Sequence, residues 1–155
     1  QNGHALGDAS GVLQADREIV LAAVRNTSYA IKYASGELKA DKEFIMSAIT
    51  NDRYGHVLKH ASEELRNDPY IVMAATQQYA HALEHATDQR RGDKQVVLTA
   101  IQNDGCALYY ASHNLKADRE VVVTAVKQNG LALLFAAEKL KDDKEVVCAA
   151  VVQNG

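Results

Sequence analysis

The sequence is poor in the residues that break helices, cross-link chains or span membranes. Its 155 residues include one proline, two cysteines and no tryptophan. The cysteines, Cys106 and Cys148, form no C-x-x-C pair, and two lone thiols in a helical chain favour a reducing, intracellular compartment. No apolar run reaches the roughly 18 residues of a membrane span, so no membrane-spanning segment is expected.

Charge and motifs argue against several classes of function. The formal net charge is −3, which gives no general attraction to nucleic acid or to anionic lipid. The sequence contains no G-x-S-x-G, P-loop, H-E-x-x-H or C-x-x-C motif. We therefore expect a protein without catalytic activity and without an organic cofactor.

What the sequence has instead is one unit repeated along its whole length. Successive units open at spacings of 25, 27, 25, 25 and 25 residues, with Asp16, Asp41, Asp68, Asp93, Asp118 and Asp143. We interpret the chain as one array with a half repeat at 1–15, full repeats at 16–40, 41–67, 68–92, 93–117 and 118–142, and a half repeat at 143–155. Because both ends fall inside a repeat, we expect a piece of a longer array.

Each unit predicts two short helices. The opening Asp is a good N-cap, because its carboxylate accepts from the free N–H groups of the first turn. An Asn-Gly-like break such as Asn129-Gly130 follows, and the second helix then carries apolar residues at helical spacing. About twelve helices this short are marginal alone, so the sequence predicts an all-α solenoid of 25-residue helical hairpins that stack on their neighbours.

The units share the pattern D-[KR]-E-V-V-x-x-A-V-x-Q-N-G-x-A-L-x-[YF]-A-[SA]-x-x-L-K. This pattern resembles the tandem repeat known as domain of unknown function 4116, and the resemblance covers essentially all 155 residues. It is clearest in 93–117 and 118–142. The family has no assigned activity, so the resemblance implies a helical repeat fold and no catalytic residue.

Two units depart from the pattern. The unit at 41–67 carries a two-residue insertion, Arg53-Tyr54, before Gly55, which we expect to lengthen the turn between its helices. The unit at 68–92 has Arg90 where the others have Leu. These departures indicate either drift, or a local change of curvature or a specialised binding patch, and the sequence leaves both open.

Histidines suggest a metal site. Two pairs recur at the same positions of consecutive units, namely His56, His60, His81 and His85. The four-residue spacing places each pair on one helix face. If the two helices lie side by side, the four imidazoles converge as ligands for Zn²⁺ or Ni²⁺. The alternative is that these histidines simply pack there, because other units hold tyrosine or apolar residues at both positions.

Aromatic side chains suggest a partner-binding strip. Its members occupy the two histidine positions of the repeat, except Tyr109, which lies one residue before the second position. They are Tyr29, Tyr33, His60, His85, Tyr109, Tyr110 and Phe135. They either seal the contact between adjacent repeats or line a groove that anchors a protein. Neighbouring positions change freely between units, with Lys59, Glu84, Tyr109 and Leu134 in one column and Glu63, Asp88, His113 and Glu138 in another. Such positions are typical of a solvent-facing or recognition surface.

Basic residues gather at the turns between units, and the densest group is Arg90, Arg91 and Lys94. A regular row of cations can follow the phosphates of nucleic acid. However, a cap Asp and an early Glu lie among them in almost every unit. A charge-balanced, solvated ridge is therefore the competing interpretation.

The sequence favours a non-catalytic protein–protein interaction scaffold, because helical repeat arrays present long surfaces suited to protein partners. Binding of nucleic acid or phosphate groups along the basic ridge is the alternative, and a metal site at the four histidines is a third hypothesis. Exposed end faces also lead us to expect end-to-end self-association.

Overall fold

Every secondary-structure element of the protein is helical. The computed structural model describes residues 3–50 and 52–154, and in these ranges there are α-helices and 3-10 helices but no β-strand. The all-α class predicted from the sequence is therefore confirmed. No helix in the same two ranges is both long enough and apolar enough to cross a membrane.

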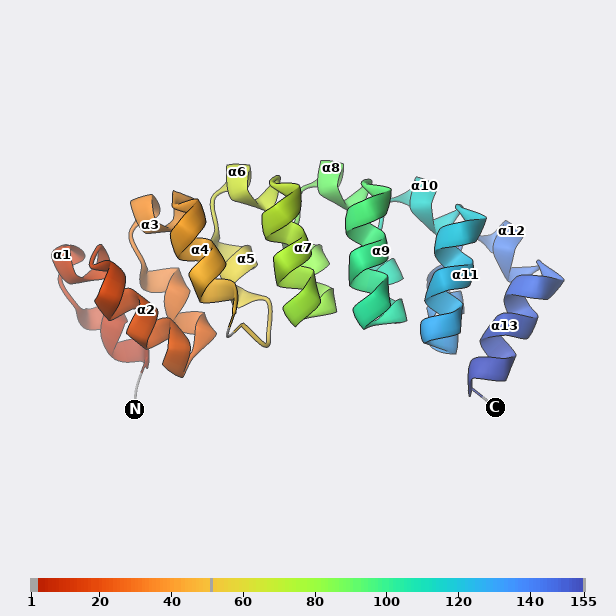
Figure 1. Ribbon diagram of the computed structural model, residues 1–155, viewed down its shortest axis with the longest axis horizontal. Coiled ribbons are helices and arrows are strands. Elements are labelled where there is room, and N and C mark those ends of the chain that lie inside the picture. The colour runs from red at the N-terminus through yellow and green to blue at the C-terminus, as the bar shows by residue number, and fades with distance from the viewer. Residues whose placement is uncertain (1–2, 51, 155) are drawn as a thin grey trace.

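Three kinds of helix alternate along the chain (Figure 1). The long helices are α2 (Arg17–Asn26), α4 (Lys42–Ile49), α7 (Pro69–Gln78), α9 (Lys94–Asn103), α11 (Arg119–Gln128) and α13 (Lys144–Asn154). The 3-10 helices are η1 (Gly3–Asp8), η2 (Ser28–Tyr33), η3 (Ala80–His85), η4 (Gly105–Tyr110) and η5 (Gly130–Phe135). The short α-helices are α1 (Gly11–Gln14), α3 (Gly36–Ala40), α6 (Glu63–Arg66), α8 (Asp88–Arg91), α10 (His113–Lys116) and α12 (Glu138–Lys141). In the unit at 41–67 an α-helix, α5 (His56–His60), replaces the 3-10 helix.

The expectation of two helices per unit, about twelve in all, is wrong in its count. The segment predicted as one second helix is divided into a 3-10 helix and a separate short α-helix. The division lies at Ala111 and Ser112, whose ψ angles of 157° and 158° are extended. The Ser112 hydroxyl then accepts from the backbone N–H of Leu115 at 3.5 Å and starts the short helix.

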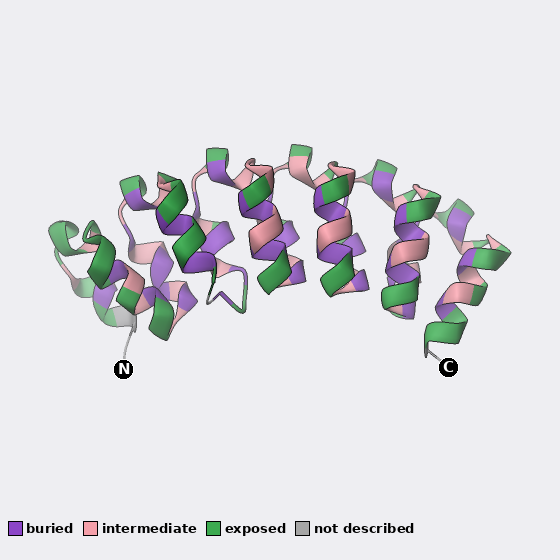
Figure 2. Cartoon of the chain, viewed as in Figure 1, coloured by how far each residue is buried: buried purple, intermediate pink, exposed green. Residues whose placement is uncertain are grey.

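The long helices lie side by side in a row that follows an arc, and the 3-10 helices form a second row behind them (Figure 1). The short helices lie along the outer edge of the arc. Buried residues recur in every repeat, and exposed residues occur on all three kinds of helix, among them the short helices and the ends of the long helices (Figure 2). Each repeat therefore buries its apolar residues mainly between the two rows and against its neighbours.

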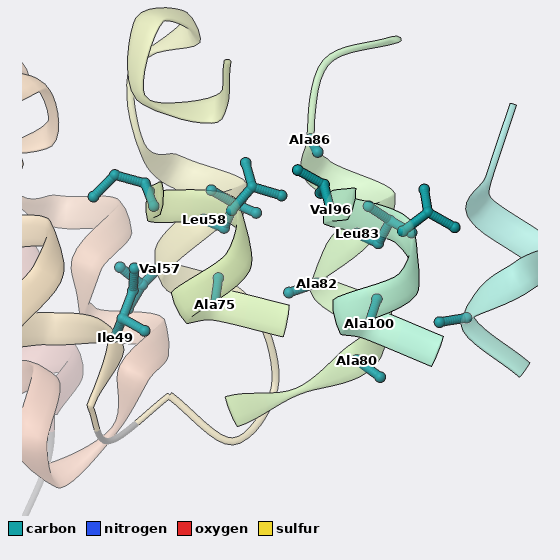
Figure 3. Close-up of a cluster of buried hydrophobic side chains, with 14 of the residues drawn as sticks. Ile49, Val57, Leu58, Ala75, Ala80, Ala82, Leu83, Ala86, Val96 and Ala100 are labelled. Atoms are coloured by element: carbon teal, nitrogen blue, oxygen red, sulfur yellow. The ribbon is translucent and has the colours of Figure 1, made fainter. Parts of the chain in front are cut away.

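Small and β-branched residues fill the core between the rows. In α11 the side chains of Val121, Val122 and Val126 are fully buried, and so is Ala125. Alanines from the long helices and the second row, such as Ala75 and Ala82, lie beside larger residues such as Leu83 (Figure 3). Alanine at these positions lets neighbouring backbones approach closely, which explains why the units repeat it.

The opening aspartates cap the long helices as the sequence predicts. Asp118 Oδ1 accepts from the backbone N–H of Glu120 at 2.9 Å and of Val121 at 3.2 Å. The same arrangement recurs at Asp16, Asp68, Asp93 and Asp143, and Asp41 accepts from the backbone N–H of Phe44 at 2.8 Å. Each carboxylate satisfies first-turn donors that would otherwise lack a partner.

Backbone hydrogen bonds join consecutive repeats. The residue immediately before a short helix donates its backbone N–H to a carbonyl in the last turn of the preceding short helix. Examples are Ser62 to the Lys39 carbonyl at 2.9 Å and Ser112 to the Arg91 carbonyl at 2.8 Å. At the opposite end of the long helices, Gln128 Nε2 donates to the Asn103 carbonyl at 3.2 Å. The hydrogen bonds therefore connect the repeats at both ends.

Ion pairs add a second connection. The cation that follows an N-cap reaches the N-cap carboxylate of the next repeat, as in Arg17 to Asp41 at 2.6 Å and Lys42 to Asp68 at 2.6 Å. Lys94 and Arg119 repeat this contact with Asp118 and Asp143. The Lys94 ammonium is the leading cause that lowers the pKa of Asp118. These pairs are largely exposed, so each contributes little alone, but together they fix the register between repeats.

The insertion before Gly55 forms a longer turn, as predicted. Asp52 is buried, and its carboxylate accepts from the backbone N–H of His56 at 3.1 Å and of Val57 at 2.7 Å. Gly55 has φ = 72°, the one left-handed residue in the described ranges. Glycine adopts this conformation without steric cost, and it lets the longer turn lead into α5.

Replacing Gly105 with alanine is expected to destabilise the array. A Cβ atom at Gly105 would collide with the carbonyl oxygen of Ala125 and lie 3.0 Å from the Asn129 nitrogen, both in backbone of the next repeat. We expect Gly105→Ala to lower the free energy of unfolding by about 1–3 kcal/mol, measured by urea denaturation. The matched control is Gly36→Ala, where nothing lies within 4 Å of the new Cβ, and its effect should stay within about 1 kcal/mol. Equal effects of the two substitutions would contradict the close approach of Gly105 to the backbone of the next repeat.

Candidate functional site

A groove follows the angle between the second row and the short helices. Its first hollow, of about 1070 Å³, lies between the repeats at 41–67 and 68–92 and includes Glu63, Glu84 and Asp88. Its second hollow, of about 520 Å³, lies one repeat further on and includes Tyr109 and Lys116. Because Glu84, Asp88 and Arg91 line both hollows, the two form one groove across three repeats.

The groove includes residues from two positions that vary between units, namely Glu84 and Tyr109 at one position and Glu63 and Asp88 at the other. Lys59, Glu84, Tyr109 and Leu134 are exposed at the equivalent point of α5, η3, η4 and η5. Glu63, Asp88, His113 and Glu138 are exposed at the first residue of successive short helices. The columns that the sequence identified as a solvent-facing or recognition surface therefore lie on one face, whereas the neighbouring core positions are the same in nearly every unit.

Most of the predicted aromatic strip seals contacts between repeats. Tyr29 lies edge-on to His60 of the next unit, with ring centroids 6.4 Å apart. His81 lies against Tyr110 of the next unit in the same way, at 5.5 Å. In both contacts the residue at the first histidine position of one unit meets the residue at the second histidine position of the following unit. These side chains are half-buried as a result.

Other members of the strip differ in exposure. Tyr33 is half-buried in η2 and packs where Gly7 of the preceding half repeat has no side chain. Tyr109 is 55% exposed, so it is the member most available to a partner. Its ring lies edge-on to Tyr110 at 5.0 Å and to Phe135 at 5.1 Å, and Lys116 Nζ lies 5.3 Å from the ring centre.

The four histidines do not converge. His56 Nδ1 hydrogen-bonds with Ser28 Oγ at 3.0 Å, and His81 Nε2 with Asp104 Oδ2 at 2.9 Å. Across residues 3–50 and 52–154 no group of three or more His, Cys, Asp or Glu side chains is placed to hold a metal ion. His60 packs against Tyr29 of the preceding unit and His81 against Tyr110 of the following unit, so these two rings lie on opposite sides of the pair of units. Binding of Zn²⁺ or Ni²⁺ by His56, His60, His81 and His85 stays a prediction that this geometry does not favour.

His60 and His85 favour the neutral form. Burial is the main cause that lowers the pKa of each imidazole below its ordinary value of 6.5. At His60 the charges of Lys39 and Lys59 also lower the pKa. At His85 the charge of Glu84 raises the pKa and that of Lys59 lowers it, and burial prevails. His60 Nε2 is buried and has no hydrogen-bond partner in the part of the chain that the structure describes. Protonation of either ring therefore works against the folded state.

The predicted phosphate-binding cations all have carboxylate partners. Arg90 Nη1 contacts Asp93 at 2.7 Å, and Arg91 contacts Asp88. Lys94 Nζ contacts Asp118 at 2.9 Å and Glu120 at 2.7 Å. The basic group is therefore charge-balanced, as the competing interpretation of the sequence expects.

Arg90 compensates for a missing ion pair. Pro69 occupies the first position of α7, where other repeats have Lys or Arg, so this repeat has no cation there for Asp93. Arg90 reaches Asp93 from its own repeat, and its Nε also donates to Asn67 Oδ1 at 3.3 Å. The divergence of this unit thus has a structural reason that local sequence reasoning missed.

The family comparison agrees with this architecture. The profile of a family described as a domain of unknown function, DUF4116, matches residues 1–39, 16–54, 41–91, 93–141 and 124–155. The chain belongs to the DUF4116 family. No curated protein and no solved structure gives a significant match. The overlapping DUF4116 matches fit tandem repeats, and they assign no activity to the groove.

Sequence reasoning missed part of the groove in this DUF4116 array. Ser62, Arg66 and Lys116 line it from the short helices. The signal that identifies them is the break after an alanine, such as Ala61-Ser62, Ala86-Thr87 and Ala111-Ser112, where one helix ends and the short helix beside the groove begins. If the segment were one continuous helix, as predicted from the sequence, these side chains would not face the groove.

The two buried histidines predict a loss of stability in mild acid. Because their folded pKa values lie below 6.5, the unfolded chain binds more protons as the pH falls through that value, and unfolding is favoured. We expect the Tm of the parent protein to fall between pH 7.5 and pH 5.5, and to fall less for His60→Gln/His85→Gln. The control is His113→Gln at an exposed position. Equal falls for all three proteins would show that the imidazoles contribute nothing.

A double-mutant cycle tests the compensation at Asp93. In an Arg90→Leu background, Pro69→Lys restores the cation that other repeats have at this position. We expect Pro69→Lys to raise the unfolding free energy by about 1 kcal/mol more in that background than in the parent, where Asp93 is already paired. Urea denaturation of the four proteins measures this difference. The same effect of Pro69→Lys in both backgrounds would rule out the compensation.

Proposed function

We propose that the chain is a section of an α-solenoid that acts as a non-catalytic scaffold for protein partners, which it binds in the groove. One observation carries the proposal: a core that repeats almost unchanged, beside a groove whose lining differs between the three repeats that it crosses. A constant core keeps the spacing of the groove positions regular. A varying lining gives each repeat its own contact, which is how helical repeat arrays select partners.

Nucleic-acid or phosphate binding at Arg90, Arg91 and Lys94 is the alternative function. It requires these cations to leave the carboxylates that they contact in every case. The groove itself carries several carboxylates, which repel phosphate. Both observations support the protein scaffold over this alternative.

Exposed tyrosines on the two faces give a matched test. Tyr109 lies in the groove and is 55% exposed, whereas Tyr70 lies on α7 and is 69% exposed. Each has a lysine near its ring, Lys116 at 5.3 Å and Lys42 at 5.6 Å. The two residues thus differ mainly in the face they occupy.

We expect Tyr109→Ala to weaken partner binding about tenfold or more, as loss of an exposed aromatic anchor does, while Tyr70→Ala leaves it unchanged. The measurement is affinity capture from a nuclease-treated lysate under reducing conditions, read by quantitative mass spectrometry, with circular dichroism to check folding. Partners retained equally by both variants would place binding outside the groove. Partners that disappear with nuclease, and with Arg90→Glu/Arg91→Glu, would favour the nucleic-acid alternative.

A further inference from the structure

The two hollows of the groove differ in charge. The first has four carboxylates, from Glu63, Glu64, Glu84 and Asp88, against the guanidinium groups of Arg66 and Arg91. Asp88 is paired with Arg91. In the described ranges Glu63, Glu64 and Glu84 take part in no salt bridge. His85 adds no positive charge at neutral pH, because burial lowers its pKa. The first hollow therefore carries a net negative charge, with three carboxylates that take part in no salt bridge among the described residues.

The second hollow is aromatic and charge-balanced. Tyr109 and Tyr110 line it together with Arg91 and Lys116, and with Glu84 and Asp88, which it shares with the first hollow. Asp88 is paired with Arg91, so this hollow gives an incoming cation no net attraction. An apolar or aromatic side chain can instead cover the exposed face of Tyr109.

The shape of the groove suits an extended chain. The hollows, of about 1070 and 520 Å³, join at Glu84, Asp88 and Arg91 and run across three repeats. A compact ligand would occupy one hollow only. An extended segment passes along both, and its side chains meet a different pair of groove residues in each repeat.

We propose that this groove binds an extended peptide segment that places Lys or Arg side chains in the first hollow and an apolar or aromatic side chain on Tyr109. Charge complementarity with Glu63, Glu64 and Glu84 selects the basic residues, and the difference between a negative first hollow and a charge-balanced aromatic second hollow fixes the direction of the segment. The inference rests on the proposed scaffold function and specifies the chemistry of its partner.

The test is a selection of peptides on the intact chain. The probe is a display library of random peptides about twelve residues long, which extend far enough to cross both hollows. The selected peptides are then synthesised and titrated by fluorescence anisotropy against three proteins: the parent, the groove variant Glu63→Gln/Glu64→Gln/Glu84→Gln, and the control Glu18→Gln/Glu43→Gln/Asp142→Asn. The control removes the same charge at exposed positions that do not line the groove.

We expect the selected peptides to be enriched in Lys and Arg relative to the library. Their affinity should fall about tenfold in the groove variant, because three exposed charge contacts are lost, and should stay unchanged in the control. Raising the salt concentration should weaken binding to the parent more than to the groove variant. Tyr109→Ala should weaken the same peptides without removing their preference for basic residues.

Two other outcomes overturn the inference and can be told apart. If the selected peptides are not basic, or bind the groove variant and the control equally, the assigned chemistry is wrong while a scaffold function can stand. If no peptide is selected and Tyr109→Ala changes no captured partner, the groove is not a binding site, and the proposed function falls with the inference.

Discussion

The contact between consecutive repeats is the interaction on which the rest of the structure depends. A helix of four residues such as α10 has no stability of its own, because one turn fixes several residues for very few hydrogen bonds. It persists because Ser112 donates to the preceding repeat and Leu115 is buried beneath it. The 3-10 helices depend on the same contact, since each is buried between a long helix and the next repeat.

That dependence divides the positions of a repeat into two groups. Positions where the backbone approaches the next repeat hold small residues, and at Gly105 the backbone of the next repeat occupies the space of a side chain. The equivalent points hold Ser28, Gly55, Ala80 and Gly130. Positions that face the groove touch little protein, so Glu84 and Tyr109 can occupy equivalent places without a change in the array. A repeat array of this kind can therefore change the side chains of its groove repeat by repeat while its stability stays nearly the same.

The sequence predicted the features that depend on local chemistry. Asp118 and its five equivalents could be predicted as N-caps, because an Asp carboxylate before an apolar run can accept from the free N–H groups of the first turn. The sequence did not reveal the break at Ala111-Ser112, because a 3-10 helix followed by one α-turn leaves nearly the same apolar spacing as one continuous helix. It also did not predict the partners of the histidines, since the stagger between units is set by packing across repeats and has no trace in the spacing within one unit.

Arg90 shows how local divergence can preserve a repeated interaction. The other units have leucine at the position of Arg90, so the arginine on its own suggests the loss of a core residue. The pair with Asp93 indicates that it supplies, from a different place, the cation that Pro69 removes. A proline at the first helical position is favourable for the helix, yet it removes the side chain that joins two repeats. Pro69 and Arg90 therefore belong together. The ion pair between the repeats is kept, while the residue that provides its cation changes. At this contact the interaction with Asp93 is preserved and the identity of the cation is not.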